Sequence, residues 1–323
     1  MPEPHDEGEC VIALDVGGTG MKGALLDREL KPVLTARRPT PRGAGPDAVL
    51  DAVTAALTTL AEQAAHHALT VRRAGVVVPG IVDEERALAV FSANLGWRDL
   101  RLADLLARRT GLPVTLGHDV RAGGYAETVL GAARGARDVL FVAIGTGISA
   151  AVISDGHPLR AGGYAGELGH LVVEPDGAPC GCGSHGCLET VAAAPAIAAA
   201  YTARSGHAVD GAAGVAALVA RGDADAAAVW ARASEALGAA LATATTLLAP
   251  ELIVLGGGLA EAGELLLAPV RAALAEHLTF QRRPNVVRAA LGDEAGCLGA
   301  GLHAWQAAEG AGVPGPAGAA VAR

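Results

Sequence analysis

The sequence predicts an α/β fold built from two related lobes, and three observations support this prediction. Residues 10–27 read as a strand, a glycine-rich turn and a second strand. A similar unit returns at residues 141–153, around Gly145-Thr146-Gly147. Around each unit, β-rich segments come first and alternating strand and helix patterns follow. With 323 residues, 51% of them hydrophobic, the chain can bury the core of one large domain or of two ordinary ones.

The two strand–turn–strand units align over a short internal repeat. A shift of 127 residues superposes four pairs: Gly18 and Gly145, Thr19 and Thr146, Gly20 and Gly147, Met21 and Ile148. A recurring supersecondary unit of this kind is typical of a fold whose halves share one plan.

Further elements follow from turn residues and apolar spacing. In the first part of the chain they are a loop at 36–46, an amphipathic helix from Asp47, a buried strand at 74–78 that runs into a hairpin tipped by 83–85, a helix at 99–109, a strand at 113–116 and a helix from near Asp119. In the second part they are a long helical stretch at 192–249, a buried strand at 252–255, a strand at 285–291 and a helix at 295–307. Residues 309–323 are rich in Gly, Pro and Ala and predict a frayed tail.

Composition argues against several classes of protein. The formal net charge of −9 is unlike that of a nucleic-acid binder, which needs a basic face. No uninterrupted apolar run reaches the roughly 20 residues that span a bilayer. Residues 1–9 are polar and acidic, unlike a signal or transit peptide. We therefore expect a cytoplasmic protein that binds neither membranes nor nucleic acid.

Three glycine-rich turns follow predicted strands, at Gly17, Gly145 and Gly256. Glycine lets a backbone turn tightly and present its N–H groups to phosphate oxygens. The alternative is three ordinary turns in a chain with 44 glycines. The matched pair of turns favours the phosphate-binding interpretation.

Two aspartates come at the ends of predicted strands. Asp15 precedes the first glycine turn and could hold Mg²⁺ beside phosphates, or simply bond its own turn. Asp119 could accept a proton from a substrate hydroxyl, because carboxylates at strand ends face ligands in α/β folds. Position alone favours the alternative role for Asp119, that of a helix N-cap.

Three of the five cysteines are clustered with a histidine nearby. His170, Cys180, Cys182 and Cys187 form a Cys₃His set, which predicts a structural zinc ion without an open coordination position. Free or disulfide-bonded cysteines are the alternative. Cys10 and Cys297 lie in apolar settings and are expected to be small buried residues.

Together these motifs resemble the ROK family of sugar kinases and repressors, within the actin-like ATPase superfamily. The matching segments are the phosphate motifs at 14–19 and 144–147, the sugar-side segments at 78–83 and 93–97, the zinc signature at 166–170 with 180–183 and 186–189, and the adenosine-side turn Gly256-Gly257-Gly258. The zinc signature is the most specific of these.

The resemblance implies two RNase H-like lobes around a central cleft that binds ATP and a hexose. The expected lobes are 1–118, completed by about 298–323, and 119–297. Asp119 would be the general base on the sugar hydroxyl. Asn94, Glu167, His170 and Glu189 would hydrogen-bond the other hydroxyls, with His170 also binding zinc. The resemblance assigns the phosphates and nucleotide, with Mg²⁺, to Asp15, Gly17, Gly18, Thr19, Gly145, Thr146, Gly147, Gly256, Gly257 and Gly258.

Two positions depart from the family pattern. His118 stands where the family usually has the Asn that contacts the sugar, so His118 is a candidate sugar contact of different reach. Gly20 stands where many members have Lys. Lys22 could replace that lysine near the phosphates or could be a solvated strand residue, and the alternation of its neighbours favours the second role.

The sequence therefore predicts an ATP-dependent hexose kinase, a phosphotransferase with an alcohol acceptor, acting on the 6-hydroxyl of glucose. An N-acylhexosamine kinase, for N-acetylmannosamine or N-acetylglucosamine, is the alternative within the family. A non-catalytic sugar-sensing regulator is the alternative from another class. Polyphosphate stays open as a donor, and the resemblance implies a homodimer or homotetramer.

Overall fold

The computed structural model describes residues 8–310, and the predictions for residues 1–7 and 311–323 lie outside this range. Its chain forms two compact units. The first comprises the chain up to Ala126, the segment Arg160–Ala165 and the chain from Glu294; the second comprises Glu127–Leu159 and Gly166–Asp293. The unit boundary therefore falls within helix α3 (Asp119–Val129), after its first two turns, whereas the sequence placed a lobe boundary before this helix.

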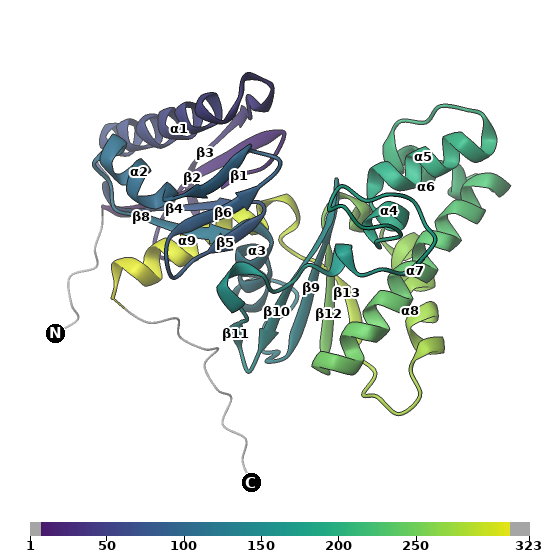
Figure 1. Ribbon diagram of the computed structural model, residues 1–323. Helices are drawn as coiled ribbons and strands as arrows, with labels where there is room; N and C mark the ends of the chain where they lie inside the picture. The colour runs from purple at the N-terminus through teal and green to yellow at the C-terminus, as the bar shows by residue number, and fades with distance from the viewer. Residues whose placement is uncertain (1–7, 311–323) are drawn as a thin grey trace, which may run out of the picture. The chain divides into compact units, whose positions relative to one another are not determined.

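The first unit contains a five-stranded mixed sheet (Figure 1). Its order is β3 (Pro32–Pro39), β2 (Gly20–Leu26), β1 (Glu9–Val16), β4 (Thr70–Val78) and β8 (Val114–His118). The first three strands pair antiparallel, whereas β1, β4 and β8 run parallel. Strand β3 begins before the predicted loop and continues into it, because residues 32–39 pair with β2.

Helices cover both faces of the first sheet. Apolar residues of α1 (Pro46–His66) and α2 (Leu102–Thr110) form one core with Ile12 and Leu14 of β1. The alternate residues Val11 and Ala13 pack with α9 (Ala295–Ala308) on the other face. A small antiparallel sheet of β5 (Ile81–Asp83), β6 (Leu88–Ser92) and β7 (Trp97–Leu100) follows β4 in the chain.

The second unit repeats the sheet of the first. Its order is β11 (His157–Pro158), β10 (Ile148–Ser154), β9 (Val139–Ile144), β12 (Leu252–Gly256) and β13 (Asn285–Arg288). Again the first three strands are antiparallel and the last three parallel. The prediction of two related α/β lobes is therefore confirmed. The central hairpins differ by one residue in their turns, since Val16 pairs with Met21 but Ile144 pairs with Ile148.

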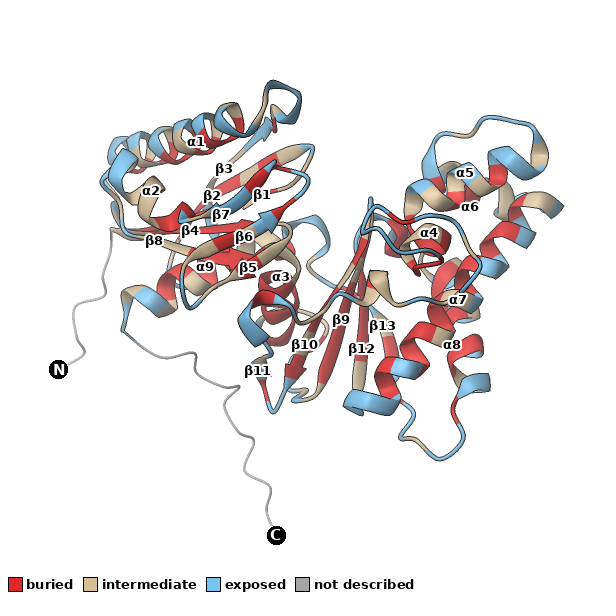
Figure 2. Cartoon of the chain, in the orientation of Figure 1, coloured by how far each residue is buried: buried red, intermediate tan, exposed pale blue. Residues whose placement is uncertain are grey.

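Helices of the second unit bury their apolar sides together, as the red segments of α7 and α8 show in Figure 2. They are α4 (Glu189–Ala192), α5 (Ala194–Ser205), α6 (Gly211–Ala220), α7 (Ala224–Leu248) and α8 (Glu264–His277). The long helical stretch expected at 192–249 is helical over most of its length, and two breaks divide it into α5, α6 and α7. Gly206 and Gly222 adopt positive φ and end α5 and α6, and the Asp223 carboxylate caps α7 by accepting the N–H of Ala226 at 2.8 Å.

Short 3₁₀ helices complete the described chain, at Arg42–Ala44, Ala161–Gly163, Leu168–His170, Gly258–Ala262 and Gly292–Glu294. Within residues 8–310, no helix combines the length and the apolar character that crossing a membrane requires.

Candidate functional site

In the first unit, predicted site residues gather where the parallel strands end. Asp15, next to the end of β1, pairs in register with Val77 of β4. Val78, the last residue of β4, pairs with His118, the last residue of β8. The first glycine turn and Asp119 follow β1 and β8 directly. Ligands of α/β sheets bind at this carboxyl edge, so the structure brings these residues to the expected side of the sheet.

The first glycine turn is fixed by a residue that sequence reasoning missed. The N–H of Gly17 donates to the carbonyl of Gly20 at 2.9 Å. The buried Thr40 donates its hydroxyl to the Gly17 carbonyl at 2.7 Å and its N–H to the Thr19 carbonyl at 3.1 Å. Thr40 lay in the predicted loop, and only its place beside β2 gives it this role.

Two further predicted residues border this turn. A Cβ added to Gly18 would lie 3.4 Å from Cβ of Asn94, so Asn94 lies against the turn. A Cβ added to Gly296 would lie 2.6 Å from Oδ2 of Asp15, so the start of α9 approaches this carboxylate closely. Lys22 is half-buried and directly opposite Asp15 in the β1–β2 register, which places the two side chains on one face.

At the start of α3, the residue that caps the helix is His118. The N–H of Arg121 donates to Nδ1 of His118 at 3.2 Å, which is the bond an N-cap side chain makes with the third helical residue. Asp119 is the first helical residue, and its Oδ1 accepts the adjacent N–H of Val120 at 2.7 Å, which is not a capping bond to the second or third N–H of the helix. The N-cap alternative for Asp119 is therefore not what the structure contains. The Asp119 carboxylate instead lies in the first turn, where the helix dipole favours negative charge.

A buried carboxylate organises this corner of the first unit. Glu84 accepts the Nε–H of Arg121 at 2.8 Å on Oε1 and the Nε–H of Arg160 at 2.9 Å on Oε2. Oε1 also accepts the N–H of His118 at 3.2 Å. Burial by itself raises the pKa of Glu84, but the charges of His303 and Arg121 and these hydrogen bonds bring that pKa below its usual value. The sequence indicated only a hairpin tip here.

His303 of α9 lies beside the same group. A Cβ on Gly117 would be 2.8 Å from its Nδ1, so glycine at this position of β8 makes room for the ring. Complete burial lowers the pKa of His303, which favours the neutral ring, and the Glu84 carboxylate opposes this effect.

In the second unit, the predicted zinc ligands converge. One ligand atom from each of His170, Cys180, Cys182 and Cys187 lies within 4.8 Å of the others. The Sγ atoms of Cys182 and Cys187 are 3.7 Å apart, as are Sγ of Cys180 and Nδ1 of His170. Tetrahedral coordination with Zn–S bonds of about 2.3 Å puts two sulfurs about 3.8 Å apart. The cluster therefore fits a zinc ion, and the free Cys10 and Cys297 are buried as predicted.

The segment that carries His170 packs closely on β10. A Cβ on Gly166 or Gly169 would collide with the carbonyls of Ala150 or Ile148, and Gly166 also has a φ of 103°. With Nδ1 facing Cys180, the opposite nitrogen of His170, Nε2, lies 3.8 Å from Oε2 of Glu167. Both Glu167 and His170 keep about a third of their side chains exposed, at 38% and 35%.

The second and third glycine turns lie side by side. Gly256 pairs with Ala143, and a Cβ on Gly257 would overlap the backbone of Ile144, directly before the turn at Gly145. Glu189 reaches the same turn, because its Oε2 accepts the N–H of Ile148 at 2.9 Å. Gly147 leaves room for this carboxylate. The carboxyl edge of the second sheet thus gathers both turns and Glu189.

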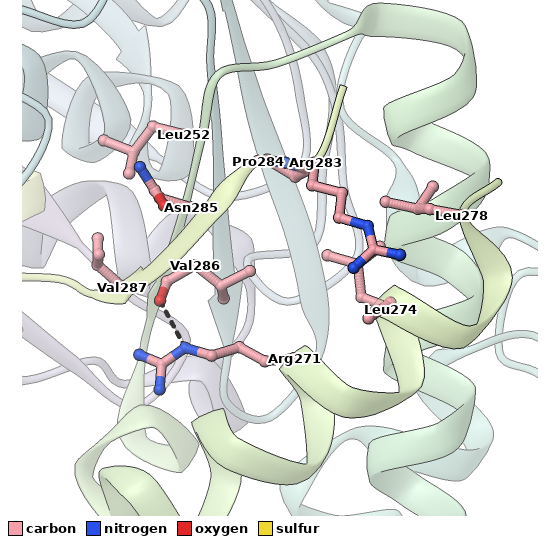
Figure 3. Close-up of a pocket in the computed structure, with 10 residues that line it drawn as sticks. Leu252, Arg271, Leu274, Leu278, Arg283, Pro284, Asn285, Val286 and Val287 are labelled. Carbon is pink, nitrogen blue, oxygen red and sulfur yellow. Dashed lines mark hydrogen bonds between the residues drawn. The ribbon is translucent and has the colours of Figure 1, made fainter. Parts of the chain in front are cut away.

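A cavity of about 510 Å³ lies elsewhere on the second unit (Figure 3). Leu252 and Asn285, which begin β12 and β13, line it together with Arg271 and Leu274 of α8. Arg271 donates its Nε–H to the carbonyl of Val286 at 2.9 Å. The cavity is at the amino ends of the parallel strands, opposite to the glycine turns, and none of the predicted site residues lines it.

A family model described as the ROK family matches residues 11–307. The chain belongs to the ROK family. It is 33% identical over 312 residues to the glucokinase of Streptomyces coelicolor, covering 90% of this chain and 95% of that protein. It is 33% identical over 191 residues to the N-acetylmannosamine kinase of Citrobacter koseri, covering 58% of this chain and 63% of that protein.

A solved ROK structure matches over nearly the whole chain. A ROK family glucokinase from Streptomyces griseus, in complex with glucose and AMPPNP, has a TM-score of 0.79 and 31% identity, and the match covers 92% of this chain and 99% of that one. Membership of the ROK family confirms the resemblance that the motifs indicated. The two units of this chain accordingly carry the fold of ROK kinases.

Proposed function

We propose that this ROK protein is an ATP-dependent hexose kinase that phosphorylates the 6-hydroxyl of glucose, with Asp119 as general base. The observation that supports the proposal most directly is the position of the Asp119 carboxylate and the contacts that it makes. His118 caps helix α3, so the Asp119 carboxylate does not serve as the N-cap. Asp119 follows β8 directly and therefore lies at the carboxyl edge of the sheet. Similarity to glucokinases, one of them solved with glucose and AMPPNP, supports this substrate pair.

The proposed reaction needs a base and phosphate-binding donors. The sugar hydroxyl oxygen forms a bond to the γ-phosphorus of ATP, the bond from that phosphorus to the bridging oxygen breaks, and ADP leaves. The hydroxyl proton passes to the Asp119 carboxylate. The N–H groups of Gly17 and Gly145 close their own turns by donating to the carbonyls of Gly20 and Gly147. The other backbone N–H groups of the turns at Gly17–Thr19 and Gly145–Gly147 would face the phosphates, and the Gly256–Gly258 turn would face the nucleoside. Asp15 would hold Mg²⁺, which neutralises phosphate charge when bound.

For the sugar, we propose four contacts besides Asp119. Asn94 of the first unit and Glu167, His170 and Glu189 of the second would hydrogen-bond its hydroxyls. Zinc, when bound, fixes the orientation and tautomer of His170. With Nδ1 directed at the cysteines, Nε2 of His170 is the nitrogen that would meet a hydroxyl.

An N-acylhexosamine is the second candidate substrate, favoured by the similarity to an N-acetylmannosamine kinase over 58% of the chain. ADP release should be measured with Mg-ATP and glucose, mannose, fructose, glucosamine, N-acetylglucosamine and N-acetylmannosamine, and repeated with polyphosphate as donor and sugar phosphate as readout. We expect glucose to give the highest kcat/KM. Preference for an acylated sugar would transfer the proposal to the second candidate. No turnover on any sugar, with folded and zinc-loaded protein, would overturn it.

A further inference from the structure

We infer that His118 is a positioning residue for Asp119 and not a sugar contact. Its Nδ1 caps α3, and its Nε2–H donates to the Asp119 carboxylate. The inference rests on the proposed function, in which Asp119 is the base. It concerns the position at which this chain departs from the Asn usual in its family, and it assigns a role that an Asn at this position could not fill.

The tautomer of His118 follows from its contacts. Nδ1 accepts the N–H of Arg121 at 3.2 Å, and a ring nitrogen that accepts cannot carry a proton. The proton of the neutral ring is therefore on Nε2. Nε2 lies 3.4 Å from Oδ1 of Asp119, which is acidic and acts as the acceptor. Both ring nitrogens are thus engaged within the first unit.

Burial supports the same conclusion. Only 5% of the His118 side chain is exposed, against 24% for Asp119. A sugar hydroxyl would have to displace one of two intramolecular contacts to reach the ring. A substrate can approach Asp119 more readily. His118 therefore acts on the reaction through Asp119.

The surrounding charges hold His118 in place. Glu84 accepts the His118 N–H at 3.2 Å and binds the side chains of Arg121 and Arg160. Arg121 also donates through Nη2 to the carbonyl of Val82 at 3.0 Å. The buried His303, on α9, faces the same carboxylate. Glu84 thus links the hairpin after β5 to the start of α3, which leaves His118 little freedom to turn away.

The two oxygens of the Asp119 carboxylate have different roles in this arrangement. Oδ1 receives the Val120 N–H at 2.7 Å and the His118 ring. Oδ2 is then the oxygen that takes the substrate proton. These contacts on Oδ1 fix the plane of the Asp119 carboxylate, and orientation of a base contributes to turnover.

Two matched variants separate the ring nitrogens. In His118→Asn, the amide oxygen can replace Nδ1 as cap acceptor, but no group reaches Asp119. In His118→Gln, the longer side chain can bring its N–H to the place of Nε2. We expect His118→Asn to lower kcat about tenfold with sugar Kd unchanged. We expect His118→Gln to retain more of kcat than His118→Asn, also with sugar Kd unchanged.

A loss of sugar affinity in His118→Asn with kcat unchanged would overturn the inference, because it would make His118 a sugar contact. A readout independent of turnover is ¹⁵N NMR of the histidine rings in the wild-type protein, assigned by His118→Gln. The inference requires His118 to be the tautomer with the proton on Nε2, and a proton on Nδ1 would overturn it. If the wild type phosphorylates no sugar while the NMR shows the Nε2–H tautomer, the proposed function fails but the His118–Asp119 pair stands.

Discussion

The carboxylate of Glu189 accepts the N–H of Ile148 at 2.9 Å, which joins the end of the zinc loop to the first residue after the second glycine turn. Glu189 follows Cys187 by two residues and opens α4. An ordered Cys₃His loop therefore positions the turn that we assign to phosphates. Through this connection, the proposed zinc would help to order the phosphate-binding turn as well as orient His170.

The first prediction concerns Gly147. A Cβ there would overlap Oε2 of Glu189, so the carboxylate must move and lose its bond to Ile148. We expect Gly147→Ala to cost about 1–3 kcal/mol of unfolding free energy. Gly145→Ala is the matched control, because a Cβ at Gly145 has no neighbour within 4 Å. Urea unfolding measures both, and equal stability of the two variants would contradict the role of Glu189.

The second prediction concerns the zinc site. Cys182 is exposed, so Cys182→Ala loses little packing but removes one of four ligands. We expect zinc content to fall from about one per chain to well below one, and sugar affinity to fall with it because His170 loses its orientation. Cys297→Ala removes a buried thiol outside the cluster and should keep its zinc. Elemental analysis that finds unchanged zinc in Cys182→Ala would refute the site.

The third prediction concerns Glu127, a fully buried carboxylate of α3. Its Oε2 accepts the N–H groups of Ala132 at 2.7 Å and Ala290 at 3.2 Å, and its Oε1 accepts that of Leu291 at 2.8 Å. Glu127→Ala removes the acceptor of three partly buried hydrogen bonds, and we expect a loss of about 1–3 kcal/mol.

The control for Glu127 is an exposed carboxylate of the same unit. Glu261 pairs with Arg288 at 3.1 Å and is 65% exposed, so Glu261→Ala should cost less than about 1 kcal/mol. If denaturant unfolding finds both variants equally stable, the hydrogen bonds of Glu127 do not carry the stability assigned to them.

The fourth prediction concerns acid stability. The pKa of Glu84 is lower in the folded protein than its usual value, so the unfolded chain binds this proton more readily. The stabilisation is present above the unfolded pKa of about 4.5 and is lost as the pH falls through the folded pKa. Glu84→Gln should therefore be less stable than the wild type at neutral pH, with a smaller further loss on acidification. Urea unfolding between pH 3 and pH 7 measures this, and parallel profiles would argue against a lowered pKa.

Short-range patterns were sufficient for much of the fold and site. The glycine turns, the Cys₃His set and the central strands depend on residues close together in the chain. The internal repeat indicates that the second sheet resembles the first. The turn of the first hairpin is one residue longer than the turn of the second. The 127-residue shift therefore aligns the second strands of the two hairpins but leaves their first strands one residue out of register.

Long-range contacts could not be predicted in the same way. Glu84 forms hydrogen bonds with His118, 34 residues later in the chain, and with Arg160, 76 residues later. Local spacing therefore gives no sign that the carboxylate at the hairpin tip binds several distant groups. The roles inferred for His118, which positions the carboxylate, and for Asp119, which accepts the proton, depend on the orientation of the His118 ring. The contacts of Glu84 help to fix that orientation. The breaks in the stretch at 192–249 did have a local signal, in Gly206 and Gly222, which the high alanine content obscured.

The most direct test of the account is the Asp119→Asn variant with glucose and Mg-ATP. Asn keeps the shape of the side chain and can still accept the Val120 N–H, but it cannot take a proton. We predict that glucose Kd, measured by calorimetry, changes less than about threefold while kcat falls by about a thousandfold. Near-normal turnover of Asp119→Asn would contradict the assignment of Asp119 as the general base.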